Sequence, residues 1–275
     1  MSEKALTLPP RPKLMIWSVL KKLALAALFI FLIIWSILGM LERINFDRLL
    51  SVRTIESFNR IIPQMFQFDF SQFGRIMSLI LETLFIAFTG SLMAAILAVP
   101  LGFLTAKNMM GTTWGGKIAN GFFKLWLNAI RTFPEILLAL IFVASVGPSA
   151  FAGVLAIAIG STGMLGKLYG EVIETIDMNV VEAMEANGAN KTQILFYGIL
   201  PQVFPEFLSY AIYRFEIDVR ASTILGVIGA GGIGTLIVIS AANRNWGEVG
   251  LIVMAIIVVV TVIDYFSASI RKRIV

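Results

Sequence analysis

Residues 181–202 read VEAMEANGANKTQILFYGILPQ, a polar stretch that lies between long apolar runs. Its Glu, Asn, Lys and Gln side chains are not stabilised by contact with lipid hydrocarbon, whereas apolar residues dominate the chain before and after it. A segment of this composition is expected to lie outside the bilayer if the rest of the chain spans it. The stretch therefore predicts a membrane protein with a substantial polar connection, and it raises the question of what that connection contacts.

The composition of the whole chain agrees with a membrane location. The 275 residues are 58% hydrophobic and only 14% charged, and the mean hydropathy is +0.87. A soluble domain has about 25% charged residues, so we predict an all-α membrane protein. The chain has no cysteine and no histidine, which excludes disulfides and removes the commonest general base and metal ligand. We expect no catalytic residue, no metal site, no enzymatic activity and no nucleic-acid partner.

Six stretches are predicted to be transmembrane helices. The first, Leu23–Leu41, is 19 uncharged residues, which as a helix would extend about 28 Å, close to the thickness of a hydrocarbon core. The others lie near 83–106, 118–145, 151–165, 205–234 and 249–266. Charged and apolar residues alternate over 42–75, which predicts short helices at the membrane interface. We therefore divide the chain into a basic cytoplasmic tail (1–22), a first span with an outer interfacial segment (23–75), and a core (76–275).

The lysines predict the orientation. Six spans place both termini on the same side of the membrane. If that side is the cytoplasm, all ten lysines fall on cytoplasmic segments or, for Lys124, near the cytoplasmic end of a span; their positions are 4, 13, 21, 22, 107, 117, 124, 167, 191 and 272. An excess of positive charge in short loops marks the cytoplasmic side. We therefore expect both termini and the 181–202 stretch to be cytoplasmic.

Two glycine motifs look like nucleotide-binding sequences. GTTWGGKI (111–118) ends in Ile where a phosphate-binding loop needs Ser or Thr, and GAGGIG (229–234) matches a dinucleotide motif. Both motifs require a strand before and a helix after, which neither position offers, so we expect no nucleotide or other cofactor in this chain. The second motif has two open interpretations, close helix packing or a broken helix end that forms a gate. Its glycines are Gly229, Gly231, Gly232 and Gly234.

Charged residues inside the predicted spans are candidates for function, because ionisable groups are costly there. Three pairs stand four residues apart and are expected to neutralise each other on one helix face: Arg131–Glu135, Arg214–Asp218 and Glu216–Arg220. The last two pairs point to different sides of a helix, so at most one of their arginines lines a central path. The candidates for such a path are Arg131, Arg214 and Arg220.

A further acidic stripe, Glu171, Glu174 and Asp177, has a spacing that a metal site could use. Its position next to a polar stretch favours a solvated helix face instead.

Glu182-Ala183-Met184-x3-Gly188, followed by Leu200-Pro201, resembles the E-A-A-x3-G-x9-I-x-L-P loop of ABC-importer permeases. Met184 replaces the third motif residue, and Gly198 stands in place of Ile. Further similarity to the phosphonate-import permeases runs over about 70–275. It is carried by RTFPEILLALIFV (131–143), STGMLGKLYGEVIETID (161–177), LPQVFPEFLSYAIYRFEIDVRASTILGVIGAGGIG (200–234) and IDYFSASIRKR (263–273).

The resemblance implies a type I ABC-importer permease fold in which loop 182–201 is a cytoplasmic coupling helix. It also implies a homodimer, a dimer of separate ATP-binding subunits that hold ATP-Mg, a periplasmic phosphonate-binding protein, and a bacterial inner membrane. The solute would be a phosphonate or a related phosphorus oxyanion. The residues expected to couple the chain to the ATPase are Glu182, Ala183, Glu185, Gly188, Leu200 and Pro201.

Within this loop we expect Gly188 to allow a turn and Pro201 to end the element before the next span. Two alternatives remain open. One is a permease of the same fold for another solute, such as methionine. The other is an autonomous secondary transporter without an ATPase.

Overall fold

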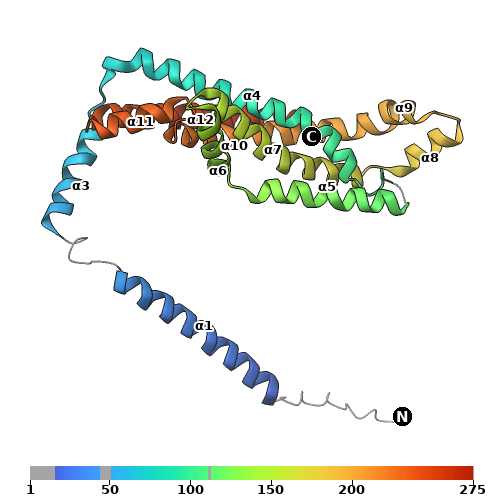
Figure 1. Cartoon of the computed structure of the whole chain (residues 1–275), viewed down its shortest axis with the longest axis horizontal. Helices are drawn as coiled ribbons and strands as arrows, with labels where there is room; N and C mark the ends of the chain where they lie inside the picture. Colours follow the sequence, from blue (N-terminus) through green and yellow to red (C-terminus); the bar gives the residue numbers. More distant parts are fainter. Residues whose placement is uncertain (1–15, 44–50, 111–112, 275) are drawn as a thin grey trace, which may run out of the picture. The chain divides into compact units, whose positions relative to one another are not determined.

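The computed structural model describes residues 16–43, 51–110 and 113–274, and every regular element in these ranges is a helix (Figure 1). The all-α prediction is therefore confirmed. The chain divides into two compact units, Met1–Arg60 and Ile61–Val275. Most of the predicted basic tail, and part of the predicted interfacial segment, lie outside the described residues.

The first unit contains α1 (Ile16–Arg43) and the beginning of α3 (Val52–Met65). Within α1, Val19–Leu41 is long and apolar enough to cross a membrane, and it includes the predicted first span. All of its side chains are exposed in this structure, as expected of a helix that is apolar on every side and surrounded by lipid. The second helix, α3, falls in the predicted interfacial segment, and its location at the interface stays a prediction.

The second unit is a helical bundle. After a 3₁₀ turn at Phe70–Gln72, its helices are α4 (Phe73–Thr105), α5 (Trp114–Thr132), α6 (Glu135–Val146), α7 (Ala150–Glu174), α8 (Met178–Ala186), α9 (Lys191–Gln193), α10 (Leu200–Val227), α11 (Ile233–Ala242) and α12 (Trp246–Ile274). Short polar side chains begin several of them. Thr113, Ser149 and Asp177 each accept a hydrogen bond from a backbone N–H in the first turn, which satisfies donors that the helix leaves free.

Small residues bring the central helices together. α4 packs along α7, and α10 lies against both (Figure 1). A Cβ atom added at Gly90 of α4 would lie 2.7 Å from Ile157 Cγ2, and one added at Gly102 would lie 2.7 Å from Tyr169 Cβ. Tyr169 in turn stacks on Phe207 of α10, with ring centroids 4.0 Å apart. Close backbone approach of this kind is how transmembrane helices associate without a hydrophobic driving force.

The number of spans differs from the prediction. Among the residues that the structure describes, four helices are long and apolar enough to cross a membrane, or five if α5 and α6 are one bent span. Six spans are therefore not confirmed. The predicted fifth span falls on α10, which carries five charged residues, and on the first residues of the short α11.

The predicted third span, 118–145, is not one helix. It breaks at Phe133 and Pro134 into α5 and α6, which meet at 83°. Proline disfavours the helical conformation of the residue before it and lacks a backbone donor, which accounts for the break. The expected Arg131–Glu135 pair is consequently wrong, because its two residues lie on opposite sides of the bend and Glu135 contacts another arginine.

Candidate functional site

The polar stretch singled out in the sequence forms α8, α9 and a π-helical turn, Ile194–Ile199, that leads into α10. Asp177 caps α8 through a hydrogen bond from the Asn179 backbone N–H, 2.9 Å long, and its own N–H donates to Gln202 Oε1 at 2.9 Å. Val181 is buried at the base of α8. The beginning of α8 is therefore tied both to its own first turn and to the start of α10.

The opposite face of α8 is exposed. Glu182, Ala183 and Glu185 are all exposed, so the predicted coupling residues on this helix lie on its surface. Gly198, in the π-helical turn, leaves space for Met184: an added Cβ would lie 2.9 Å from Met184 Sδ. The two departures from the motif, Met184 and Gly198, thus pack against each other on the inner side.

Gly188 ends the helix by a left-handed turn. Its φ angle is +78°, a region that residues with a Cβ rarely adopt. The Gly188 N–H donates to Glu185 O at 2.9 Å, and the Ala189 N–H donates to Met184 O at 3.0 Å, which is the usual way to close a helix C-terminus. No atom lies within 4 Å of an added Cβ, so glycine is needed here for backbone conformation and not for space.

The expectation that Pro201 ends the element is wrong. Leu200 and Pro201 occupy the first turn of α10, and the helical path continues from α9 through the π-helical turn without a break. In the π-helical turn just before it, the Leu200 N–H donates to Leu195 O, five residues back, and a local adjustment of this kind accommodates a proline within a continuous helical path. Leu200 is half-buried and Pro201 is exposed.

Arg214 stands at the centre of a buried ionic cluster. Its side chain is 8% exposed, and its Nε lies 2.9 Å from Asp218 Oδ1 and 2.9 Å from Ser161 Oγ. Its Nη2 contacts Glu135 of α6. Asp218 is fully buried and also accepts from Ser91 Oγ at 2.6 Å. The Arg214–Asp218 pair expected from the sequence is confirmed, and the cluster joins α4, α6, α7 and α10.

Arg220 belongs to a second cluster on another side of α10. It contacts Glu216 at 2.8 Å and Asp264 of α12 at 2.7 Å, and Arg271 contacts the other Glu216 oxygen at 3.1 Å. The expected Glu216–Arg220 pair is thus confirmed. The sequence did not indicate the two partners from α12, because Asp264 and Arg271 are distant in the chain.

Arg131, in the last turn of α5, differs from the other two arginines. It is exposed, and no ion pair involves it within the ranges that the structure describes. Its backbone N would lie 3.1 Å from a Cβ added at Gly163 of α7, so the end of α5 is held close to α7 at the bend.

The glycine motif forms the connection between α10 and α11. Gly229, Gly231 and Gly232 have φ angles of +89°, +82° and +77°, and Gly234 lies in the first turn of α11 against Gly226. The N–H of Gly232 donates to Glu82 Oε1 at 3.2 Å. The motif is thus a break within the helical path that packs on α4, and its role as a gate stays a prediction.

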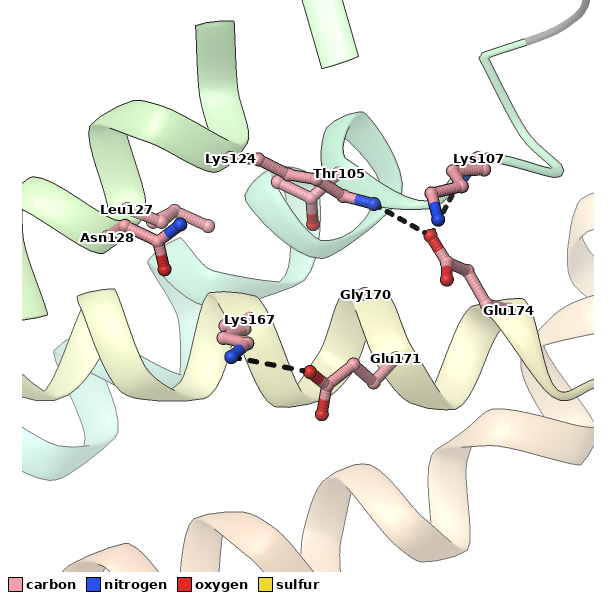
Figure 2. A pocket seen from close by; sticks show the side chains of 9 residues that line it. All are labelled: Thr105, Lys107, Lys124, Leu127, Asn128, Lys167, Gly170, Glu171 and Glu174. Atoms are coloured by element: carbon pink, nitrogen blue, oxygen red, sulfur yellow. Dashed lines mark hydrogen bonds and ion pairs between the residues drawn. The ribbon is translucent and has the colours of Figure 1, made fainter. Parts of the chain in front are cut away.

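Two residues of the acidic stripe pair with lysines, and the third, Asp177, caps α8. Lys124 Nζ lies 2.9 Å from Glu174 Oε1, and Lys167 Nζ lies 3.6 Å from Glu171 Oε1. No group of metal-ligating side chains occurs in the described part of the chain. Glu171 and Glu174 border a cavity of about 230 Å³. The sequence did not indicate it, because its lysines lie in three separate segments: the turn after α4, α5 and α7 (Figure 2).

Comparison with known proteins agrees with this arrangement. Residues 98–275 match the family described as the binding-protein-dependent transport system inner membrane component. The phosphite transport system permease protein PtxC of Stutzerimonas stutzeri is 39% identical over 205 residues, which are 74% of this chain and 73% of that protein. The phosphate-import permease protein PhnE of Mycolicibacterium smegmatis is 36% identical over 197 residues, which are 70% of this chain and 36% of that protein.

A solved structure shows the same fold. An inward-facing crystal form of the MetNI methionine ABC transporter superposes with a TM-score of 0.62 at 19% identity, covering 73% of this chain and 96% of that one. The family match covers more than half of the chain, and the matched range includes α8 and the charged residues of both ionic clusters. The chain therefore belongs to the family of inner membrane components of binding-protein-dependent transport systems.

Proposed function

We propose that this chain is the permease subunit through which a phosphonate, phosphite or phosphate passes in an ABC importer. The relatives with 36–39% identity are named for phosphite and phosphate transport, and they support this solute class over methionine. The methionine transporter is similar at only 19% identity, a level that supports a common fold and no common solute.

The observation that carries the proposal is the exposed face of α8. Glu182, Ala183 and Glu185 lie on a short helix that is capped at both ends and tied to α7 and α10. A displacement of such a helix is passed on to the bundle, because its capped ends keep the helix from unwinding when a partner moves it. In our proposal a separate ATPase dimer, which holds ATP-Mg, binds this face and moves the bundle through loop 182–201.

The proposal includes the rest of the assembly. A second copy of the chain completes the path, and a periplasmic phosphonate-binding protein delivers the solute. Both termini and α8 are cytoplasmic, as the positions of the lysines support. The chain itself carries no ATPase site.

Uptake by reconstituted vesicles tests the solute class and the energy source together. The chain, co-purified with its ATPase and binding protein, is expected to accumulate labelled methylphosphonate, phosphite or phosphate only when ATP is present, and not methionine. Accumulation of methionine alone would show that the proposed solute class is wrong. Accumulation without the ATPase would show that the chain works as a secondary transporter.

Of the three candidate arginines, exposure and pairing favour Arg131 as the contact for the oxyanion, because Arg214 and Arg220 already contact carboxylates. A charge-assisted hydrogen bond contributes about 1.5–3 kcal/mol. Arg131→Gln should therefore reduce the apparent affinity for the solute in the uptake assay by about tenfold or more, and Arg131→Lys should reduce it less. Arg273→Gln, at an exposed position near the end of α12, is the matched control, and equal behaviour of the two Gln variants would contradict the assignment.

A further inference from the structure

We propose that Lys107, Lys124 and Lys167 form a second binding site, which takes a small phosphorus oxyanion, and that the Glu174 carboxylate occupies part of it in this structure. The presence of an anion site is argued from these side chains alone. The choice of a phosphorus oxyanion rests on the proposed function.

The site is a cavity of about 230 Å³ between the end of α4, the middle of α5 and the last turns of α7 (Figure 2). Pockets for drug-sized ligands have volumes of roughly 300–1,000 Å³, so this cavity suits a smaller solute. Gly170 and the buried Thr105 lie at its base. A Cβ added at Gly170 would collide with Thr105 Oγ1, so the absence of a side chain there keeps α4 and α7 in contact below the cavity.

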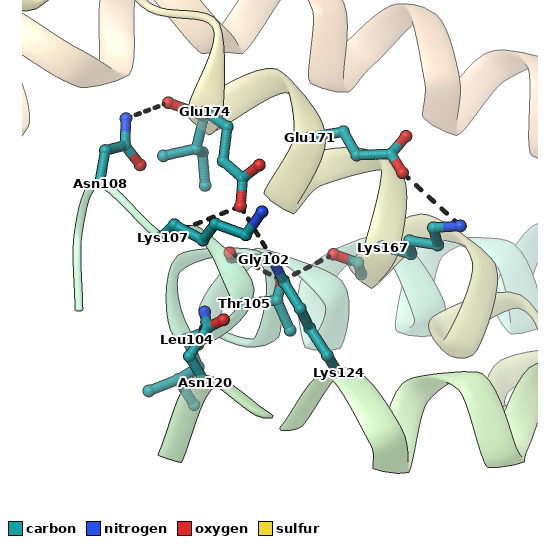
Figure 3. A network of polar contacts seen from close by, with 12 residues as sticks. Gly102, Leu104, Thr105, Lys107, Asn108, Asn120, Lys124, Lys167, Glu171 and Glu174 are labelled. Atoms are coloured by element: carbon teal, nitrogen blue, oxygen red, sulfur yellow. Dashed lines mark hydrogen bonds and ion pairs between the residues drawn. The ribbon is translucent and has the colours of Figure 1, made fainter. Parts of the chain in front are cut away.

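Glu174 already behaves as a bound oxyanion. Its Oε1 accepts a hydrogen bond from the Lys107 backbone N–H at 3.0 Å and another from Lys124 Nζ at 2.9 Å (Figure 3). A backbone N–H that donates to no carbonyl, next to an ammonium group, is a typical anion receptor. The same donors are therefore suited to one oxygen of a phosphate or a phosphonate.

The cations in the cavity exceed the carboxylates. The Lys107 ammonium makes no ion pair within the described ranges, and the longer Lys167–Glu171 pair, at 3.6 Å, is 41% and 58% exposed. Exposed pairs of this kind contribute little to stability, so Lys167 is available to another anion. Glu174 is itself 29% exposed and can turn into water when an oxyanion takes its place.

The cavity lies beside the segment that leads to α8. Asn108 follows Lys107 in the chain, and its Nδ2 donates a hydrogen bond to Ile173 O at 2.6 Å. Helix α8 begins four residues after Glu174. An oxyanion that displaces Glu174 therefore acts at the end of α7, directly before the face proposed to bind the ATPase.

Binding of inorganic phosphate tests the site. The full chain, with the subunits that co-purify with it, is placed in phosphatidylcholine nanodiscs and titrated with phosphate in a calorimeter. Lys124→Gln should weaken the phosphate affinity by about tenfold or more, since a charge-assisted hydrogen bond is lost. Glu174→Gln should strengthen it, because the competing anion is removed. Lys124→Arg should retain most of the affinity, which separates lost charge from a damaged fold.

Lys272→Gln, an exposed position on α12 outside the cavity, is the control for net charge. The same titration in phosphatidylglycerol nanodiscs identifies the source of the anion. Weaker phosphate binding there, dependent on Lys124, assigns the site to a lipid headgroup, and unchanged binding assigns it to the free oxyanion.

If Lys124→Gln and Lys272→Gln bind phosphate and phosphatidylglycerol like the unaltered chain, or if Glu174→Gln binds phosphate no more tightly, the site is refuted. Vesicle uptake is a separate measurement, so loss of this site leaves the proposed function standing. Conversely, phosphate bound by a chain that transports methionine refutes the proposed function and leaves the anion site.

Discussion

At the scale of single residues, Asp218 shows how this bundle holds charge. Its carboxylate is fully buried, yet both oxygens accept from Ser161 and one also accepts from Ser91. Arg214 then neutralises it and reaches Glu135 at the bend between α5 and α6. Each member of the cluster is satisfied by the others, so removal of one leaves an uncompensated group in a water-poor interior.

Arg214→Met tests that dependence. Breaking a buried ion pair by removing one partner costs about 3–5 kcal/mol, and this substitution should lower the free energy of unfolding by that amount in a detergent titration. Arg214→Met combined with Asp218→Asn should lose less than Arg214→Met alone, because the buried carboxylate is then neutral. A double variant that is less stable than Arg214→Met would show that charge is not the reason.

Gly188→Val tests the turn after α8. The left-handed backbone costs an L-residue about 1–2 kcal/mol, and more when it is β-branched. We expect ATP-driven uptake to fall at least about tenfold while the amount of protein in the membrane stays the same. Gly121→Val in α5 is the matched control, since both glycines have open space around them and only Gly188 has a positive φ. Normal uptake by Gly188→Val would contradict a coupling role for the segment.

At the scale of helices, α7 is the element on which the bundle is built. Gly160, Gly163 and Gly166 face Glu135, Ile130 and Leu127 in turn, so α6 and α5 follow its surface closely. On its other side α7 contacts α4 through Gly102 and Gly90. Small residues at both contacts set the distance between helix axes, and a larger side chain has no space to occupy.

Gly102→Val should separate α4 from α7. An added Cβ lies 2.7 Å from Tyr169 Cβ and 3.3 Å from the Gly170 backbone N, and overpacking of this kind costs typically about 1–3 kcal/mol. The unfolding midpoint in the same detergent titration should fall accordingly. Gly74→Ala, in the first turn of α4 with no atom within 4 Å, should leave the midpoint unchanged or raise it slightly. Equal effects of the two substitutions would refute the packing explanation.

At the scale of the whole molecule, the lysine-lined cavity lies at the end of the bundle that leads into α8. Here the end of α4 contacts the end of α7 through Asn108 and Glu174, and α8 begins directly after α7. The anion site proposed above and the proposed ATPase contact therefore belong to one end, and the positions of the lysines predict that this end is cytoplasmic.

The absence of native cysteine allows that orientation to be measured directly. Single cysteines at Ala186→Cys, on the exposed end of α8, and Gln72→Cys, before α4, are both accessible positions in the structure. A membrane-impermeant thiol reagent should label Gln72→Cys in cells with a permeable outer envelope, and Ala186→Cys only after the inner membrane is opened. Labelling of Ala186→Cys from outside would reverse the topology and end the proposed ATPase contact.

Local sequence patterns predicted several features correctly. Charge and hydropathy identified an all-α membrane protein, and the i,i+4 spacing identified two of three ion pairs, because partners on one continuous helix are fixed by its geometry. The third pair failed where Pro134 breaks the helix. The Pro201 prediction failed because the helical path continues through the π-helical turn before Pro201. A local adjustment of this kind accommodates a proline without ending the helix, and the proline alone does not reveal it.

The sequence by itself determined the class of the protein, its α8 segment and the residues exposed there, since composition, caps and Gly188 act over a few neighbouring positions. The tertiary structure alone decided which charges are neutralised and which are free. Glu135 contacts Arg214 at a distance of 79 residues in the chain, and Lys107, Lys124 and Glu174 meet from the turn after α4, from α5 and from α7. Those contacts depend on how closely α4, α5, α6 and α7 pack. The packing distance is set by small side chains on the facing surfaces of the helices and not by any local sequence pattern.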